Sequence, residues 1–335
     1  MKSLMLLIAG LAYVVPAEAV EAELRILPAS VVIHGSNARP GILVEEFVNG
    51  RAVKQLSRDI AWSVSRQGII RIVDDAIMPL ANGVTVLTAT SRGRSSEIEV
   101  RVTGFESPEA PGFRNHVLAI FAKTGCNSGA CHGALAGKGG FRLSLRGDDP
   151  ATDYQTIVTQ ARGRRIELAD PGRSLILAKP TGALPHKGGL RFATDSLEYK
   201  VIADWIAAGA EPPSQDDANV ERVEILPEVV QLSEGDKQNF IVRAHYSNGR
   251  IEDVTRWVKF SSSNESVASV DQNGRVSVVG PGAGSVTGWF ASQTVISGIT
   301  CAFPNDISAE VYASQPRRNF IDEHAVEKLS ELRIE

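Results

Sequence analysis

The sequence predicts a multidomain protein made of a β-sandwich, then a small all-α domain, then a second β-sandwich. Three observations lead to this fold class. A pattern of alternating apolar residues, typical of antiparallel strands, occurs twice, once on each side of the chain's middle. The middle instead shows helix-type spacing and contains two of the three cysteines. The length of 335 residues is typical of two or three domains.

The chain begins with the features of an export signal. Lys2 precedes an apolar run from Leu4 to Val15, and Ala17-Glu18-Ala19 is an A-x-A cleavage pattern. The run is short for a membrane span, although an uncleaved anchor is the alternative. We therefore expect residues 1–19 to be a signal peptide and the protein to be exported, either to the periplasm or to the cell surface.

An internal repeat flanks the middle of the chain. Residues 24–28 read LRILP and residues 223–227 read VEILP, and Asn-Gly-Arg recurs at 49–51 and 248–250. Both copies consist of short runs rich in Val, Ile and Thr, broken by Gly, Asn and Pro, and each Asn-Gly pair is a hairpin signal. About seven short strands in about 80 residues predict an Ig-like sandwich in each copy.

The second copy, residues 221–303, resembles the bacterial Ig-like group 2 domain. Residues 262–282 follow the phrase S-x-x-x-x-V-A-x-V-x-x-x-G-x-V-x-x-x-x-x-G that recurs in that family. The first copy, residues 23–104, keeps the outline but lacks the Val-Ala-x-Val part. The resemblance implies that both copies are spacers or adhesive modules.

Residues 105–211, between the copies, have helix-type spacing at both ends. The clearest helix begins after Asp195 or Ser196, either of which is a suitable N-cap, and ends at Gly209. A Pro-rich linker, residues 212–220, follows this domain. Residues 304–335 are predicted to open a further helical domain that is truncated here.

The cysteine pair lies in the phrase GCNSGACHG, where His132 directly follows Cys131. The attachment signature of c-type haem is C-x-x-C-H, but four residues separate Cys126 from Cys131. A haem site with a longer loop is the first interpretation. A Cys126–Cys131 disulfide, which an exported protein allows, and a zinc site that adds His132 and His186 are the alternatives.

Four phrases in order resemble the planctomycete-type cytochrome c module. They are G-C-x4-C-H-G, S-L-x3-K-P, P-H-x-G-G-x-R-F and E-Y-x5-W-I-x2-G, at residues 125–133, 174–180, 185–192 and 198–209. The resemblance implies a small class I-like cytochrome c domain with one covalent haem c. Cys126 and Cys131 would form its thioether bonds, and His132 would be the proximal iron ligand.

The second axial ligand is predicted from what the middle domain contains. The three methionines, Met1, Met5 and Met78, all lie outside residues 105–215, so a methionine ligand from within the domain is excluded. His186 falls where the resemblance places the distal-ligand loop, and we expect it to bind the iron. His116 is its rival, and an open site with His186 merely near the haem is the alternative. Arg191 and Lys187, beside it, are candidate contacts of the haem propionates.

The main functional prediction is therefore an exported electron carrier, and not an enzyme by itself. Its expected partners are redox proteins, including a catalytic domain outside this chain. The alternative is a non-redox cell-surface or adhesive Ig-like protein whose Cys126/Cys131 pair is a disulfide or a zinc site. A net charge of −4 argues against a nucleic-acid partner, and no pairing of nucleophile and base indicates a small-molecule substrate.

Overall fold

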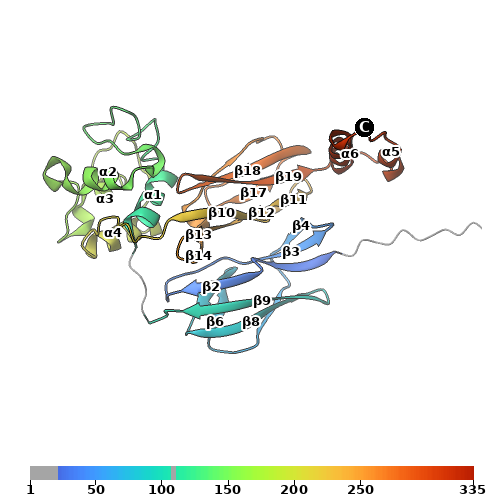
Figure 1. Cartoon of the computed structure of the whole chain (residues 1–335), viewed down its shortest axis with the longest axis horizontal. Coiled ribbons are helices and arrows are strands. Elements are labelled where there is room, and N and C mark those ends of the chain that lie inside the picture. The colour runs from blue at the N-terminus through green and yellow to red at the C-terminus, as the bar shows by residue number, and fades with distance from the viewer. Residues whose placement is uncertain (1–21, 107–110) are drawn as a thin grey trace, which may run out of the picture.

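The structure is a computed structural model that describes residues 22–106 and 111–335; the predicted signal peptide lies outside them. The molecule is elongated (Figure 1). A helical and loop-rich central region, residues 111–211, lies at one end of it. Two β units occupy the middle, and the helices α5 (Ala309–Ala313) and α6 (Phe320–Leu332) lie at the other end.

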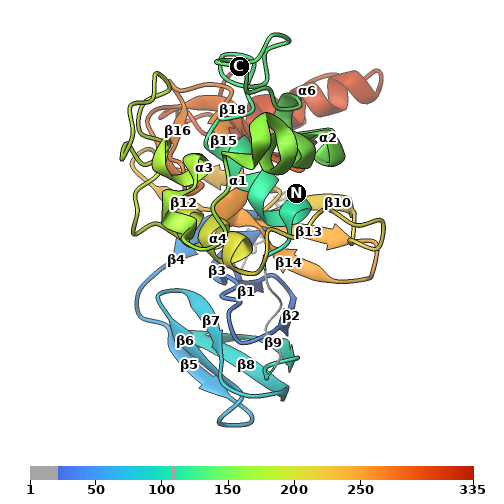
Figure 2. The same ribbon diagram turned by 90° about the vertical axis from the view of Figure 1, so that its left-hand side faces the viewer.

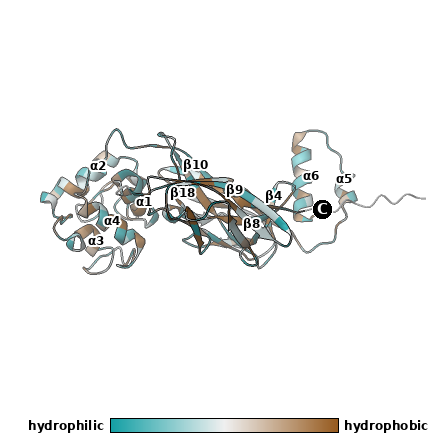
Figure 3. Ribbon diagram, turned by 90° about the horizontal axis from the view of Figure 1, so that it is seen from below, coloured by the Kyte–Doolittle hydropathy of each residue, from teal (hydrophilic) through white to brown (hydrophobic). Residues whose placement is uncertain are grey.

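The first β unit contains nine strands. Along β2 the burial alternates strictly between exposed and buried residues, as expected of a strand with one face against the core, and Figure 3 shows hydrophilic and hydrophobic stretches along strands such as β8. Asn49 and Gly50 both have positive φ and join β3 to β4 as the Asn-Gly hairpin signal predicts. The strands are β1 (Glu23–Leu27), β2 (Ser30–His34), β3 (Leu43–Val48), β4 (Arg51–Leu56), β5 (Ala61–Val64), β6 (Ile70–Val73), β7 (Ala76–Pro79), β8 (Gly83–Ser91) and β9 (Arg94–Thr103).

The second β unit repeats the order of the first. Its matching hairpin joins β13 to β14 at Asn248-Gly249, although only Gly249 of that pair has positive φ. The strands are β10 (Val220–Leu226), β11 (Val229–Leu232), β12 (Lys237–Asn239), β13 (Ile241–Tyr246), β14 (Ile251–Asp253), β15 (Lys259–Ser262), β16 (Ala268–Val270), β17 (Arg275–Val278), β18 (Gly282–Phe290) and β19 (Gln293–Cys301), with the 3-10 turn η6 (Thr255–Trp257) before β15.

The two β units share one sheet. Seven strands lie in the order β1-β3-β4-β11-β19-β18-β15, so β4 of the first unit is next to β11 of the second. β11 is parallel both to β4 and to β19. The remaining strands form four smaller sheets. The two units are therefore not the separate, closed sandwiches that the repeat predicts, and the Ig-like part of the predicted fold class holds only in part.

The central region is not a distinct all-α domain. Its helices are short, only α4 exceeds six residues, and the rest is mostly turns and loops. Ser196 caps α4 as predicted, because its side chain accepts a hydrogen bond from the Tyr199 N–H at 3.2 Å. The elements are η1 (Phe113–Val117), α1 (Leu118–Lys123), η2 (Leu145–Gly147), α2 (Pro150–Tyr154), η3 (Gln155–Thr159), η4 (Gln160–Gly163), η5 (Pro171–Arg173), α3 (Leu175–Ala178) and α4 (Leu197–Ala207).

The hydrophobic core explains why the predicted fold class is wrong for the middle of the chain. The buried side chains of the central region, with Trp205 and Phe113 among the largest, belong to the same continuous core as those of the second β unit. The first β unit has a core of its own. Short helices of this kind cannot bury all of their apolar side chains against one another. Packing against the second β unit buries the apolar surface that an independent all-α domain would bury within itself.

Polar contacts fix the central region to the second β unit; Figure 2 views the molecule from the side of the central region. The Asn115 side chain donates to the Ala218 carbonyl at 2.9 Å, and the Lys123 ammonium donates to the Arg256 carbonyl at 2.5 Å. The Arg146 guanidinium lies 4.0 Å from the ring centre of Trp289 on β18, a cation–π distance.

Candidate functional site

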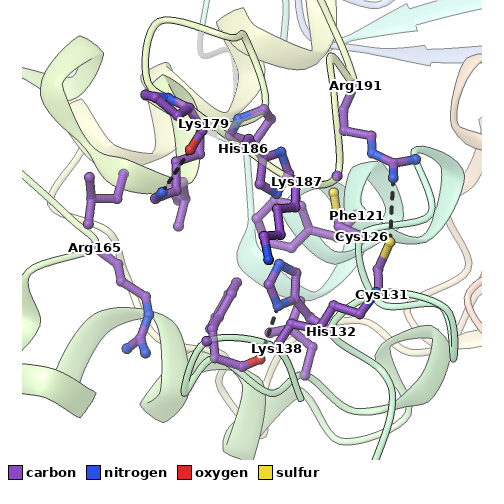
Figure 4. A pocket seen from close by; sticks show the side chains of 18 of the residues that line it. Phe121, Cys126, Cys131, His132, Lys138, Arg165, Lys179, His186, Lys187 and Arg191 are labelled. Atoms are coloured by element: carbon purple, nitrogen blue, oxygen red, sulfur yellow. Dashed lines mark hydrogen bonds between the residues drawn. The ribbon is translucent and has the colours of Figure 1, made fainter.

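The six residues singled out from the sequence come together in one pocket of the central region. Cys126, Cys131, His132, His186, Lys187 and Arg191 all line a cavity of about 330 Å³ (Figure 4). His116, the rival ligand, does not line it; its Nδ1 accepts a hydrogen bond from the Gly112 N–H at 3.0 Å. The segments before α2 and after α3 that carry these residues are far apart in sequence, and the fold brings them together.

The loop that carries the cysteines closes on itself after α1. The His132 N–H donates to the Cys126 carbonyl at 2.9 Å, and the Gly133 N–H donates to the Ser128 carbonyl at 3.0 Å. A Cβ on Gly133 would lie 2.1 Å from the Asn127 carbonyl oxygen, so only glycine fits there. The glycine that ends the cysteine phrase is therefore a requirement of the loop's tight closure.

Each histidine is held through its Nδ1 atom. His132 Nδ1 lies 3.0 Å from the Phe141 carbonyl oxygen, and His186 Nδ1 lies 3.0 Å from the Gly189 carbonyl oxygen. A carbonyl oxygen only accepts, so Nδ1 carries the proton in both rings and Nε2 is the remaining acceptor. The rings are nearly parallel, with an interplanar angle of 5° and centroids 6.3 Å apart. Burial lowers the pKa of His132, which favours its neutral form.

The two cysteines differ in their surroundings. Cys126 is buried next to the Thr124 hydroxyl at 3.3 Å, and burial raises the pKa of its thiol. Cys131 is half-buried, and its Sγ lies 3.4 Å from Nη2 of Arg191. Both are free thiols in this structure, so the disulfide alternative has no support here.

The walls of the pocket are apolar, and its charged groups are all basic. Among the described residues that line the pocket there is no Asp or Glu. Arg165 is fixed by hydrogen bonds to the carbonyls of Thr156 and Gly140, and Lys179 by one to the Pro185 carbonyl. The basic lining residues are Lys138, Arg164, Arg165, Lys179, Lys187 and Arg191. The apolar ones include Phe121, Phe141, Leu143, Leu175, Ile176, Pro180 and Pro185.

Only Lys187 and Arg191 among these cations were predicted from the sequence as pocket residues, and the other four were not. Lys138 stands in a Gly-rich loop, and Arg164 and Arg165 follow a short 3-10 turn. Lys179 lies in the S-L-x3-K-P phrase, but nothing in the local pattern of the other three separates them from surface charge. Only the surplus of basic over acidic residues near the cysteine phrase is a signal that could have pointed to them.

Comparison with known proteins identifies one domain. A bacterial Ig-like domain (group 2) is found at residues 219–295, which confirms the resemblance predicted for the second copy. Ice-binding protein 1 of Shewanella frigidimarina (strain NCIMB 400) is 29% identical over 99 residues. That match takes in 27% of this chain and 11% of the relative, so the chain spans only a small part of the curated protein it matches.

Several solved structures of surface proteins align with much of the chain at low similarity. Domains 5–6 of the S-layer protein SbsC align with a TM-score of 0.31 and 9% identity, over 84% of this chain and all of that one. The Yersinia pseudotuberculosis adhesin InvE aligns with a TM-score of 0.17 and 8% identity, over 84% of this chain and 59% of that one. Scores this low assign neither a fold nor a function to the chain.

The predicted cofactor, one covalent haem c, is not upheld. The family found in the chain is an Ig-like domain. Within residues 22–106 and 111–335, no group of three or more His, Cys, Asp and Glu side chains is arranged to hold a metal ion. The same finding leaves the zinc alternative without support. The predicted partners, redox proteins and a catalytic domain outside this chain, stay a prediction.

The described part of the chain also has no helix that is both long and apolar enough to cross a bilayer.

Proposed function

We propose that the chain is a non-redox, exported cell-surface protein whose β units form a rigid scaffold and whose central pocket binds an organic anion. The observation that carries this proposal is the lining of the pocket, in which apolar walls combine with six Lys and Arg side chains and with no acidic one among the described residues. Pockets that recognise small molecules commonly combine apolar walls with a few polar groups that fix the orientation.

The positive charge of the pocket is opposite in sign to the net charge of the whole chain. The chain has 35 Lys and Arg but 39 Asp and Glu, a net charge of −4, so a pocket with six cations and no acid is a local exception. Cations next to apolar walls attract an anion more strongly than they would in bulk water, because the local dielectric constant is lower. A ligand with an apolar body and a carboxylate, sulfonate or phosphate group fits both properties.

Arg191 and Lys187 keep a role as the groups that receive the ligand's negative charge. Arg191 is held between the Thr124 carbonyl and the Cys131 sulfur, so its planar guanidinium is already oriented before the ligand arrives. Because the histidines have their Nδ1 atoms occupied, their Nε2 atoms are the neutral acceptors that remain for a ligand's hydroxyl or amide donor.

The scaffold part of the proposal depends on the shared sheet and the shared core. The sheet joins the two β units, and the core joins the second unit to the central region. The central region, whose residues line the pocket, therefore lies at one end of a connected body, and α5 and α6 lie at the other end (Figure 1). A stalk that presents a binding region outward from a surface has this arrangement.

The test is direct binding of a probe anion, 1-anilinonaphthalene-8-sulfonate, followed by fluorescence. We expect the R191Q/K187Q double variant to bind at least about tenfold more weakly, as loss of two charge-assisted contacts predicts. The control R101Q removes an exposed arginine of the first β unit and should leave the binding unchanged. Equal affinity of the double variant and the wild type, or affinity for the uncharged N-phenylnaphthylamine equal to that for the sulfonate, would refute the anion pocket.

A further inference from the structure

The joint between the two β units combines a strand pairing with hydrogen bonds of side chains. In the shared sheet, β4 and β11 are linked by the pair Ala52 and Val230. Around this pair, the Asn239 N–H donates to the Gln55 side chain at 2.6 Å, and the Gly41 N–H donates to the Asp253 carboxylate at 2.7 Å. Further from it, Arg243 donates to the Ser30 carbonyl at 3.2 Å. Besides these polar contacts, Phe47 and Ala52 of the first unit belong to the same core as the second unit.

A carboxyl group and an amide meet at the centre of this joint, fully buried. Glu45 on β3 and Gln238 on β12 are both 0% exposed. Gln238 Nε2 donates to Glu45 Oε1 at 2.7 Å. The other atoms of the same two groups, Glu45 Oε2 and Gln238 Oε1, are buried with no hydrogen-bond partner. A native buried polar atom without a partner requires an explanation.

A single proton satisfies both of these atoms. With Glu45 ionised, its Oε2 atom and the Oε1 atom of Gln238 are both acceptors, so they cannot form a hydrogen bond with each other. With Glu45 protonated, Oε2 becomes an O–H donor, and the amide oxygen of Gln238 is an acceptor on the group already bonded to it. The carboxylic acid and the amide then form a ring closed by two hydrogen bonds, with no buried charge, and so avoid the cost of burying an unpaired carboxylate.

The charged groups on the neighbouring strands do not offset a negative charge on Glu45. On β1, Arg25 is the register partner of Glu45, but its guanidinium pairs with Glu23 and lies over the Phe47 ring. On β3 itself, Glu46 pairs with Arg94. The lysines of the adjoining strands, Lys54 on β4 and Lys237 on β12, are exposed. Burial accordingly raises the pKa of Glu45 to about 8, against the opposing effect of the Gln238 hydrogen bond.

We propose that protonated Glu45 and Gln238 form a two-bond acid–amide pair that locks the two β units together, and that loss of this proton loosens the joint. When the joint is closed, Glu45 has a raised pKa, and when the joint is open, solvated Glu45 returns to about 4.5. The closed joint is therefore most stable below about pH 4.5. It loses stability as the pH rises, by about tenfold in the opening equilibrium per pH unit, until about pH 8.

Hydrogen exchange of the full chain measures this opening. After correction for the intrinsic exchange rate, we expect amides of β11 and β12 to lose about a hundredfold in protection between pH 6 and pH 8. Amides of β8 and β9, in the sheet that does not cross the joint, serve as the internal reference and should keep theirs.

Two variants separate the acid–amide pair from general effects of pH. In E45Q an amide replaces the acid and can form the same two bonds without a titrating proton, so the pH dependence at β11 and β12 should disappear. The control E97Q changes an exposed glutamate of the first unit and should behave as wild type. Persistence of the pH dependence in E45Q overturns the proposal.

A second measurement does not depend on opening. The carboxyl ¹³C shift of Glu45, assigned by its loss in E45Q, should titrate near pH 8, and a midpoint near 4.5 in the folded protein also overturns the proposal.

Discussion

At the residue scale, the two cysteines of the pocket loop have opposite surroundings although only four residues separate them. Cys126 is buried with a raised pKa. Cys131 is half-buried and faces the Arg191 guanidinium. A thiol reacts as its thiolate, which burial opposes, and it must also be accessible to the reagent. The reactivity of each thiol therefore depends on its surroundings in the fold, which the spacing of the cysteines in the sequence does not reveal.

This difference predicts the order in which the thiols react. In the reduced protein, iodoacetamide should alkylate Cys131 at least about tenfold faster than Cys126 or the buried Cys301. Peptide mass spectrometry at timed points measures the three rates. Equal rates at Cys126 and Cys131 would contradict the surroundings described here.

At the element scale, the closed loop between Cys126 and Gly133 is the most constrained part of the site. Its tightness comes from the approach of the Gly133 α-carbon to the Asn127 carbonyl. The loop positions His132 and both cysteines at once, so a shift in its backbone displaces three lining residues of the pocket.

The two glycines of this loop provide a matched test. In G133A the new methyl would lie 2.1 Å from a backbone oxygen, and we expect a loss of about 2–3 kcal/mol in the free energy of unfolding. In G129A nothing lies within 4 Å of the new methyl, so the change should stay within about 0.5 kcal/mol. Urea unfolding of both variants gives these values. A G133A variant as stable as G129A would show that the loop is looser than its contacts indicate.

At the scale of the whole molecule, the shared core makes the central region dependent on the second β unit. Residues 111–211 expressed alone should lack cooperative unfolding, because part of their apolar surface would have no partner. Residues 111–303, which keep the second β unit, should unfold cooperatively. Near-UV circular dichroism and thermal melts compare the two fragments. A cooperative melt of the shorter fragment would restore the independent domain that the sequence predicts.

The sequence predicted what local pattern controls. The hairpin at Asn49-Gly50, the cap at Ser196 and the group 2 Ig-like domain all depend on residues close together in the chain, and each was confirmed. The first three of the four ordered phrases also contain residues that line the pocket, whereas Lys138, Arg164 and Arg165 lie outside them. The domain boundaries that follow from these patterns stay a prediction.

What the sequence missed depends on contacts between distant segments. Glu45 and Gln238 are 193 residues apart, and each reads as an ordinary polar residue of a strand. That one sheet contains strands of both repeats could not be predicted either, because the alternation along a strand identifies its buried face but not its neighbouring strand. The haem prediction transferred a family's cofactor from four short phrases, and the comparisons did not support it.

The sheet that crosses both β units has a mechanical consequence. β11 runs parallel to β19 over four residue pairs and to β4 over one, so tension along the strands would shear the β11–β19 pairs together and would act on the single β4–β11 pair that joins the two units. Independent domains strung on linkers would lengthen stepwise under tension. A molecule built around this sheet should instead keep its length until β11 separates from β4, where Val230 and Ala52 are the paired residues.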